Sequence, residues 1–577
     1  MDFWKNVTRG GERPFLIGRS ESVTYDRLRG LVASALADLD DRRIPAGERI
    51  AIVLRDEPKA IATFAASLFR GLVPIMLPFD IGRPRLEAIC RSIEPALVVS
   101  EETFISTRVV TEVELTHVAR NDLAYLLFTS GTTAAPSGVE ITRHNLCSHL
   151  DTLIRIFNFG AQTRVFNPTP VSHTDGLIFG PLLALATGGA VIRPGPMQLA
   201  EFETWIDMAR LTGATHMMTN PTVLSLIDRS ASRTDYFSFE GFQGILSGGS
   251  LLRTELWLRF EERFHTQIWN LYGLTETVTS VLYSGRHPEM GPIGTLGKAI
   301  DCEARIAPPL NDGKVVLASN VGELQVRGPH IFRGYWRNPE RTSATFVDES
   351  WMRTGDLVRA NANGSYDFLG RIKSAINSGG TLICAEEIDE CLLHHPAVAE
   401  AATVGLPDNE FEEVAVSAVV PRLNATIFES DLTAHCRSEL EVLKVPKRII
   451  VVDAIPRGDA GKPNLQAVRE LLAMNVRASS QLSGNDGDDI DSSLIELAAL
   501  VFGAEQASLS VASTPQSVEG WDSFRHVNLV LQAEELFSIR VPGKLVGQIT
   551  SLGDLSNIIR KARTGIPQRQ LRPTNEL

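Results

Sequence analysis

The chain has 577 residues, too many for one hydrophobic core, so several domains are expected. Apolar residues make up 44% of the sequence and charged residues 22%, a balance typical of globular proteins. The formal net charge of −13 argues against a nucleic-acid-binding protein, for which a basic surface is expected. The six cysteines are scattered without a CxxC pair, which argues against a zinc site or a disulfide framework and favours a reducing compartment.

The sequence carries no targeting or membrane signal that we recognise. Residues 1–5 lack the basic-then-apolar pattern of a signal peptide. The two most apolar stretches, residues 60–79 and 175–192, are both interrupted by glycine and proline. Both are expected to be buried helix–strand units, so we predict a cytoplasmic protein without a membrane span.

Helical and strand patterns alternate in the first part of the chain. Residues 25–38 and 58–69 have the helical spacing of apolar residues, and residues 49–54 and 73–77 are short apolar strands. This alternation indicates a largely parallel sheet with helices on its faces. Ligands of such sheets bind at the carboxyl ends of strands, and the loop beginning at Thr129 follows a strand.

That loop is rich in Thr, Ser and Gly. Its backbone N–H groups and hydroxyls can converge on one anion, although such a segment alone is more often a polar hairpin. Residues 126–139 resemble the phosphate-gripping loop of the adenylate-forming family, which includes acyl-CoA synthetases, peptide-synthetase adenylation domains and luciferases. The resemblance implies that the phosphates of ATP are bound by Thr129, Ser130, Gly131, Thr132 and Thr133.

The same loop departs from the family at two positions. Ala134 and Ser137 stand where members usually have Gly and Lys. Alanine stiffens the loop, and serine removes a cation that would neutralise the β- or γ-phosphate. We therefore predict weaker ATP binding or slower pyrophosphate release, unless another group compensates for the lysine or the lysine is not needed here.

Residues 165–192 contain a histidine and an acid close together. A lone histidine is most often a capping or core residue, but family members carry a His or an aromatic residue here, and the resemblance places His173 in the carboxylate pocket. Asp175 has two interpretations. It either binds a substrate amine, as an Asp in this region does in amino-acid-activating members, or it is a solvent-facing turn residue.

Residues 245–251 form a strand that ends in Gly248, Gly249 and Ser250. Glycines at the end of a strand let a flat ring approach the backbone closely. In the family this turn lies against adenine, so these residues are predicted to bind the nucleotide. A plain strand-to-helix turn is the alternative interpretation.

Residues 270–277 carry three groups suited to a nucleotide. Tyr272 offers a ring face for the base, Thr275 a hydroxyl for a phosphate, and Glu276 a carboxylate for Mg²⁺, an ion that takes one or two carboxylates plus phosphate oxygens. The resemblance extends the predicted nucleotide-binding set to Asn270, Leu271, Tyr272, Gly273 and Thr275.

Two charged residues complete the predicted nucleotide site. Asp356 would accept hydrogen bonds from both ribose hydroxyls, and Arg371 would supply a cationic fork for ribose or phosphate oxygens. Between them and Glu276, residues 322–329 and 332–336 match strands that close the large domain in the family, and we assign them a structural role.

The resemblance implies a large adenylation domain over residues 1–372 and a small mobile domain over residues 373–470. Ser374 stands at the family's hinge, where Asp or Lys is more usual. Residues 377–389 resemble the loop that faces the thiol acceptor, and their Gly-Gly form is closer to acyl-CoA synthetases than to peptide synthetases. Lys462 matches the family lysine that bridges the carboxylate and the α-phosphate. We predict catalytic roles for Lys462, Thr275, Glu276 and His173.

The remaining chain reads as an appended helical domain. Residues 477–493 are acidic and low in hydrophobic residues, as in a flexible linker, and we place the linker at residues 471–490. Residues 491–562 resemble an acyl or peptidyl carrier protein, with Ser523 as the phosphopantetheine attachment site and Phe524 in place of the usual Leu; residues 563–577 would be a frayed tail. Asp522 as N-cap would set Ser523 at a helix N-terminus, which favours a phosphodiester. An N-capped structural helix is the alternative.

The predicted fold class is α/β: a large N-terminal adenylating domain of stacked α/β sheets, a small mobile α+β C-terminal subdomain, and an all-α four-helix carrier domain. The predicted activity is ATP-dependent conversion of a carboxylic acid to acyl-AMP with release of pyrophosphate, then transfer to the thiol of its own carrier. The implied cofactors are ATP, Mg²⁺ and 4′-phosphopantetheine on Ser523. The implied partners are the acid, a phosphopantetheinyl transferase and a downstream acyl- or peptidyl-transfer enzyme.

Two alternatives remain open at this point. One is an acyl-CoA synthetase whose carrier serves another partner. The other is an inactive adenylate-binding scaffold that presents the carrier, supported by the missing lysine at Ser137. Fatty, aromatic, hydroxy and amino acids are all compatible with the motifs, and a role in secondary metabolism rests on analogy with other ligase–carrier fusions.

Overall fold

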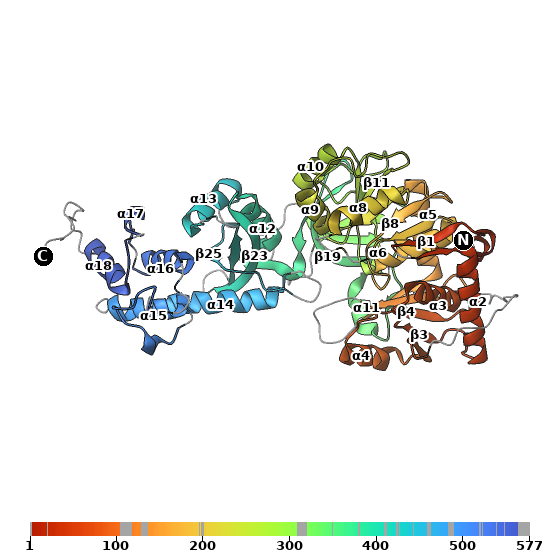
Figure 1. Ribbon diagram of the computed structural model, residues 1–577, viewed down its shortest axis with the longest axis horizontal. Coiled ribbons are helices and arrows are strands. Elements are labelled where there is room, and N and C mark those ends of the chain that lie inside the picture. The colour runs from red at the N-terminus through yellow and green to blue at the C-terminus, as the bar shows by residue number, and fades with distance from the viewer. Residues whose placement is uncertain are drawn as a thin grey trace. The chain divides into compact units, whose positions relative to one another are not determined.

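The computed structural model divides into two compact units, Met1–Lys373 and Ser374–Leu577 (Figure 1). The division falls beside Ser374. The structure describes residues 3–19, 21–103, 118–128, 137–195, 197, 201–308, 320–348, 350–378, 381–408, 412–422, 425, 427–441, 444–457, 463–482, 490–502, 504–518, 521, 523–537, 539–546 and 548–563.

The largest sheet in the described part of the first unit has nine strands, in the order β14-β13-β12-β11-β10-β8-β9-β1-β2. Strands β12, β11, β10, β8, β9 and β1 run parallel to one another, so their carboxyl ends open on one edge. The strands are β1 (Pro14–Gly18), β2 (Ser22–Thr24), β8 (Arg164–Phe166), β9 (Ala190–Arg193), β10 (His216–Thr219), β11 (Gly244–Gly248), β12 (Ile268–Tyr272), β13 (Leu282–Ser284) and β14 (Lys298–Ala299).

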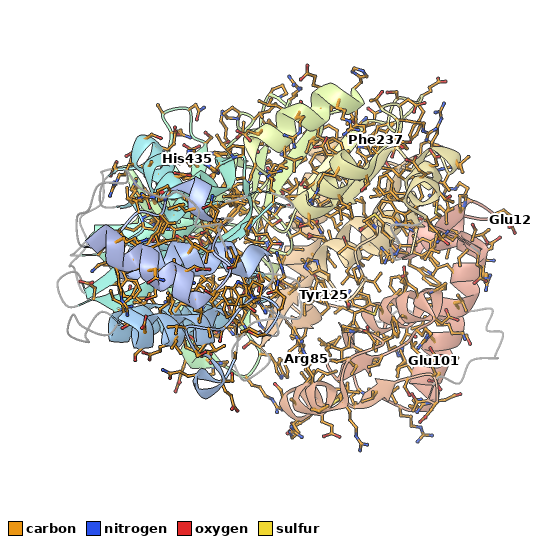
Figure 2. The ribbon with its side chains drawn as sticks, turned by 60° about the vertical axis from the view of Figure 1, so that its left-hand side comes forward. Glu12, Arg85, Glu101, Tyr125, Phe237 and His435 are labelled. Atoms are coloured by element: carbon orange, nitrogen blue, oxygen red, sulfur yellow. The ribbon has the colours of Figure 1, made fainter. Side chains whose placement is uncertain are left out.

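Amphipathic helices cover this sheet. In α8 (Phe202–Leu211) the apolar residues recur at helical spacing, and Trp205 is 2% exposed. The buried apolar residues of α8 form one core with Trp257 of α10 (Thr254–Phe264) and with Phe237. Figure 2 labels Phe237 among the packed side chains of this region. The other helices that bound this part are α5 (Arg143–Phe157), α6 (Thr174–Leu177), α7 (Leu183–Thr187) and α9 (Pro221–Ser230).

The predicted alternation of helix and strand near the N-terminus is confirmed, with element ends shifted by a few residues. Strands β3, β4 and β5 form a parallel sheet, and α2 and α3 pack together beside it (Figure 1). The Asp56 side chain accepts a 3.0 Å hydrogen bond from the Lys59 amide, which caps α3. The elements are α1 (Phe3–Arg9), α2 (Tyr25–Asp41), β3 (Arg49–Ile52), α3 (Glu57–Phe69), β4 (Val73–Met76), α4 (Arg83–Ile93) and β5 (Leu97–Val99).

The strand before Thr129 belongs to a different kind of sheet from the one expected. Strand β6 (Leu123–Phe128) pairs antiparallel with β7 (Gly138–Thr142), and Phe128 faces Gly138 across the pair. Residues 129–137 therefore connect a hairpin, rather than following a strand of a parallel sheet. The expectation failed because a short apolar strand does not reveal its partner, whereas a connection this short joins antiparallel strands. Tyr125 of β6 lies in the interior (Figure 2).

An antiparallel sheet closes the first unit, in agreement with the structural role assigned to residues 322–336. Within it β19 pairs with β20, so that Asp356 lies opposite Arg371. A short strand, β17 (Gly334–Tyr335), pairs instead with β7. The elements are β15 (Glu303–Ala307), β16 (Val321–Arg327), α11 (Pro339–Thr345), β18 (Phe346–Val347), β19 (Trp351–Ala360) and β20 (Tyr366–Arg371).

The first part of the second unit is α+β. Its sheet has the order β22-β21-β24-β23, with β25 on β24, and α12 and α13 pack on it; His435 of α13 is labelled in Figure 2. The elements are β21 (Ala375–Ser378), β22 (Thr381–Cys384), α12 (Ala385–His394), β23 (Val398–Asp408), β24 (Glu412–Pro421), α13 (Glu429–Glu439), β25 (Arg448–Val451) and α14 (Leu465–Leu482).

Helix α14 corrects the predicted linker. It continues to Leu482, so the first part of residues 471–490 is helical. Val468 and Leu472, one helical turn apart, are fully buried and anchor the helix in the core of this unit. Linker-like composition begins only with Ser483 and Gly484, and residues 483–489 lie outside the described part of the chain.

The remaining described residues form helices around a core of their own. The appended domain expected over residues 491–562 is helical in its described part, and Leu494, Leu529, Leu552 and Ile559 are fully buried among its helices. Trp521 stacks on Phe502 at 4.6 Å between ring centroids. The helices are α15 (Ile490–Phe502), α16 (Ser523–Leu536), α17 (Gly543–Val546) and α18 (Leu552–Arg563). In the described part of the chain, no helix combines the length and apolar character needed to cross a membrane.

Candidate active site

Two turns at the carboxyl edge of the nine-stranded sheet form the floor of the candidate site. Strands β11 and β12 are parallel neighbours, and their register sets Gly248 beside Leu271. Gly249 then has φ +81°, a conformation that side chains rarely adopt. After β12, a Cβ atom at Gly273 would collide with the Thr279 carbonyl oxygen, so this turn also requires glycine. The two turns are therefore specified by their glycines.

The turn after β12 leads into residues with polar side chains. Asn270 is buried at 5% exposure on β12, and Tyr272 is the last residue of that strand. Thr275 and Glu276 follow in a short 3₁₀ helix over Thr275–Thr277, whose entry is fixed by a 2.9 Å hydrogen bond from the Leu274 amide to the Thr277 hydroxyl. The local fold thus presents Thr275 and Glu276 directly beyond the sheet edge.

Three predicted nucleotide-binding residues meet in one polar cluster. The Tyr272 hydroxyl donates a 2.6 Å hydrogen bond to Asp356 Oδ2, and Arg371 Nε lies 3.1 Å from Asp356 Oδ1. Asp356 is 1% exposed, and burial raises the pKa of its carboxyl, against the opposing effects of Arg371 and the Tyr272 hydrogen bond. Burial beside this carboxylate also raises the pKa of Tyr272 well above its usual value. A buried acid that accepts one hydrogen bond and pairs with one cation is held in one orientation.

Glu276 has a partner that the sequence did not suggest. The Tyr335 hydroxyl donates a 2.6 Å hydrogen bond to Glu276 Oε1. Burial and the neighbouring carboxylate raise the pKa of Tyr335 above its usual range, so the hydroxyl remains a donor. One oriented carboxylate, supplemented by phosphate oxygens, is a donor set that Mg²⁺ accepts, so Glu276 fits the metal role predicted for it.

His173 and Asp175 lie at the same edge. The Asp175 amide donates to His173 Nδ1 at 3.2 Å, which caps α6, so the capping role considered for this histidine is present. The His173 side chain is nevertheless 55% exposed, and its Nδ1 is 3.6 Å from Asp175 Oδ2. Asp175 is 13% exposed and therefore does not face solvent as one interpretation held. Its Oδ2 lies beside Gly249, and burial raises the pKa of its carboxyl.

Several predicted site residues lie outside the described part of the chain: Thr129, Ser130, Gly131, Thr132, Thr133 and Lys462. Ser374 closes a short 3₁₀ helix over Ile372–Ser374, at the division between the two units. Ser523 is the first residue of α16. Sequence reasoning missed Tyr335, because its segment was read only as a structural strand and Glu276 is 59 residues away.

Comparison with known proteins supports the family drawn from the motifs. Residues 3–336 match the model of the AMP-binding enzyme family, and residues 387–462 match that of the AMP-binding enzyme C-terminal domain. The chain belongs to the AMP-binding enzyme family, and the predicted adenylate-forming family is thereby confirmed.

Curated relatives include ligases that act on acids and CoA. Oxalate–CoA ligase of Arabidopsis thaliana is 34% identical over 346 residues, 59% of this chain and 66% of that protein. Sulfoacetate–CoA ligase of Cupriavidus necator is 34% identical over 340 residues, 59% of this chain and 65% of that protein. The chain thus covers about two thirds of these relatives. Naringenin synthase of Pestalotiopsis fici is 25% identical over 601 residues, 94% of this chain and 21% of that protein.

Solved structures show the same fold. ATP-bound MatB from Rhodopseudomonas palustris superposes with a TM-score of 0.72 at 23% identity, over 81% of this chain and 98% of that chain. O-succinylbenzoate coenzyme A synthetase (MenE) from Bacillus subtilis, in complex with ATP and magnesium ion, gives a TM-score of 0.70 at 23% identity, over 82% and 98%. The predicted α/β adenylating fold is confirmed.

Proposed function

We propose that this protein is an AMP-forming acid–thiol ligase, with ATP and Mg²⁺ in the first step. The observation that carries the proposal is the cluster in which Asp356 accepts a hydrogen bond from Tyr272 and pairs with Arg371. These residues come from separate segments, were each predicted to bind the nucleotide, and meet near Glu276 at the edge where parallel sheets bind ligands. Membership of the AMP-binding enzyme family supports the same reading.

In the first step a carboxylate oxygen of the acid attacks the α-phosphorus of ATP. A bond forms between that oxygen and the α-phosphorus, the bond to the bridging oxygen of the β-phosphate breaks, and pyrophosphate leaves with the electron pair. Positioning and charge neutralisation supply most of the catalysis in such transfers. Asp356 would hold the ribose, Thr275 a phosphate oxygen and Glu276 the metal, which neutralises phosphate charge. Lys462 would bridge the carboxylate and the α-phosphate.

In the second step a thiolate attacks the carbonyl carbon of the acyl-adenylate. The carbon–sulfur bond forms as the carbon–oxygen bond to the phosphate breaks, and AMP leaves. Rotation at Ser374 would bring the second unit into position for this step. The names of the curated relatives make CoA one candidate acceptor.

We assign the preferred acceptor to a phosphopantetheine thiol carried on Ser523. Ser523 begins α16, a helix of 14 residues, and a helix N-terminus favours a phosphodiester. The match to naringenin synthase extends over 94% of this chain, too much to omit all of the C-terminal helices. CoA-thioester formation with a carrier that serves another enzyme is the second candidate, supported by the CoA ligases among the relatives.

Intact-protein mass spectrometry tests the acceptor. The full chain, co-expressed with a phosphopantetheinyl transferase, is incubated with MgATP and one acid at a time, with or without CoA. The proposal predicts a mass increase equal to the acyl group on the modified protein, without CoA. Formation of free acyl-CoA with no acyl group on the protein would favour the second candidate instead.

A further inference from the structure

The position that the family usually fills with lysine has a basic neighbour from another segment. The Ser137 hydroxyl accepts a hydrogen bond from the guanidinium of Arg341. Arg341 lies on α11, 204 residues further along the chain. Serine lacks the positive charge of the lysine that the family usually has here. Arg341 supplies a positive charge next to that position.

Strand pairing explains how the two residues meet. Strand β17 pairs with β7 so that Tyr335 lies opposite Val139, and the Trp336 amide donates to the Gly138 carbonyl at 2.8 Å. The chain then turns at Asn338, whose side chain accepts a 2.9 Å hydrogen bond from the Arg341 amide. This turn carries Arg341 back over the start of β7. The position of Arg341 therefore follows from the pairing of β17 with β7 and from the Asn338 cap of α11.

Aromatic packing orders the guanidinium. Its central carbon lies 3.8 Å from the centroid of the Tyr335 ring, an arrangement favourable for a cation. The same tyrosine donates its hydroxyl to Glu276. Arg341 therefore sits at one end of a chain of contacts that reaches the carboxylate proposed to hold Mg²⁺.

The charge of Arg341 is not neutralised as those of its neighbours are. Arg333 pairs with Glu140 at 2.6 Å, and Arg337 pairs with Glu94 at 2.6 Å. Among the described residues, no carboxylate lies within ion-pairing distance of the Arg341 guanidinium. A partly buried cation without a carboxylate is suited to an anionic ligand, and a guanidinium fork matches phosphate oxygens.

We propose that Arg341 binds the β- or γ-phosphate of ATP and replaces the lysine that is missing at Ser137. This inference rests on the proposed adenylation and names a phosphate-binding residue for it. Ser137 orients the guanidinium by accepting one of its N–H groups, and the remaining N–H groups contact the phosphate. AMP, which has no β- or γ-phosphate, does not use this contact.

Binding of MgATP and of AMP to the full chain, measured by titration calorimetry, tests the proposal. Arg341→Ala is expected to weaken MgATP by about tenfold, the size of one charge-assisted hydrogen bond, and to change AMP affinity by less than about twofold. Arg337→Ala is the matched control: it removes the same charge four residues earlier, from an arginine already paired with Glu94, and should leave both affinities unchanged.

Rescue separates a phosphate contact from a structural one. Arg341→Ala combined with Ser137→Lys is expected to recover most of the MgATP affinity, and Arg341→Lys to retain part of it. Unchanged MgATP binding in Arg341→Ala, equal loss for MgATP and AMP, or failure of the double variant to recover would overturn the inference. A wild-type protein that binds neither nucleotide would instead contradict the proposed function.

Discussion

The Tyr272 hydroxyl donates a 2.6 Å hydrogen bond to Asp356 Oδ2 and so joins the end of β12 to β19. This bond fixes the carboxylate that is proposed to hold the ribose. Tyr272→Phe keeps the ring and removes only the donor, so we predict about tenfold weaker binding of MgATP and AMP alike, since both carry the ribose. Titration calorimetry with each nucleotide measures the effect.

Tyr366→Phe is the control for that variant. The Tyr366 hydroxyl donates to the Ala304 carbonyl at 2.9 Å within the closing sheet, so the change removes a similar hydrogen bond away from the nucleotide. It should leave both affinities intact. A loss of MgATP binding without a loss of AMP binding in Tyr272→Phe would mean that the tyrosine acts on the phosphates and not on the ribose.

Asp175 is expected to govern which acids are accepted. Its largely buried carboxylate lies 3.6 Å from His173 and beside Gly249, at the site edge. A negative charge there disfavours acids with a second carboxylate and favours acids with an amine or a hydroxyl. We predict that Asp175→Asn raises kcat/KM for dicarboxylic acids relative to amino or hydroxy acids, in pyrophosphate-release assays over matched pairs of acids. An unchanged ratio would show that Asp175 does not face the substrate.

Ser523 is expected to carry the acyl group. Ser523→Ala should abolish both the phosphopantetheine mass increment and acyl loading, while ATP–pyrophosphate exchange continues at the wild-type rate. Ser508→Ala, which changes an exposed serine elsewhere among the C-terminal helices, should load normally. A wild-type mass increment that persists in Ser523→Ala would place the attachment on another residue.

Buried histidines are expected to limit stability in acid. His216 is 3% exposed, and burial lowers its pKa to about 4; burial likewise lowers the pKa of His330 to about 4. Between those values and the ordinary pKa near 6.5, the unfolded chain binds more protons than the folded chain, so stability falls as pH falls through this window. Below pH 4, the protonation of each histidine is expected to lower the free energy of unfolding by on the order of 3 kcal/mol.

Urea midpoints measured from pH 7 to pH 4.5 check this sign. His216→Gln removes one titrating group, so its midpoint should lie lower at neutral pH but decline less steeply with acid than that of the wild type. A decline of equal slope in both proteins would show that His216 is not responsible.

The local parts of the site could be predicted from the sequence. Strand ends followed by glycine or hydroxyl residues identified the turns at Gly249 and Tyr272, and the acid at Asp356 followed from its motif. The structure brings these segments together as expected. The alternation of helices and strands near the N-terminus could also be predicted, because the spacing of apolar residues and the helix-capping residues are local properties of the sequence.

Pairings between distant segments could not be predicted. The contact of Arg341 with Ser137 depends on β17 pairing with β7, and β17 is only two residues long. The hairpin of β6 and β7 was mistaken for part of a parallel sheet for a different reason: a short apolar strand does not reveal its partner, and the short connection that indicates antiparallel pairing was not used. The linker predicted over residues 471–490 was wrong in its first part, which belongs to α14. The end of that helix is polar, but Val468 and Leu472 are buried and anchor it.

Acid-dependent exchange of labelled pyrophosphate into ATP tests the central claim most directly. The wild-type full chain is assayed over fatty, aromatic, hydroxy, amino and small polar acids, with Lys462→Ala as the inactive control. The account predicts exchange that requires one class of acid and is lost in Lys462→Ala, with MgATP binding retained in that variant. Wild-type protein that binds MgATP but shows no acid-dependent exchange over the panel would contradict the account and favour an adenylate-binding scaffold.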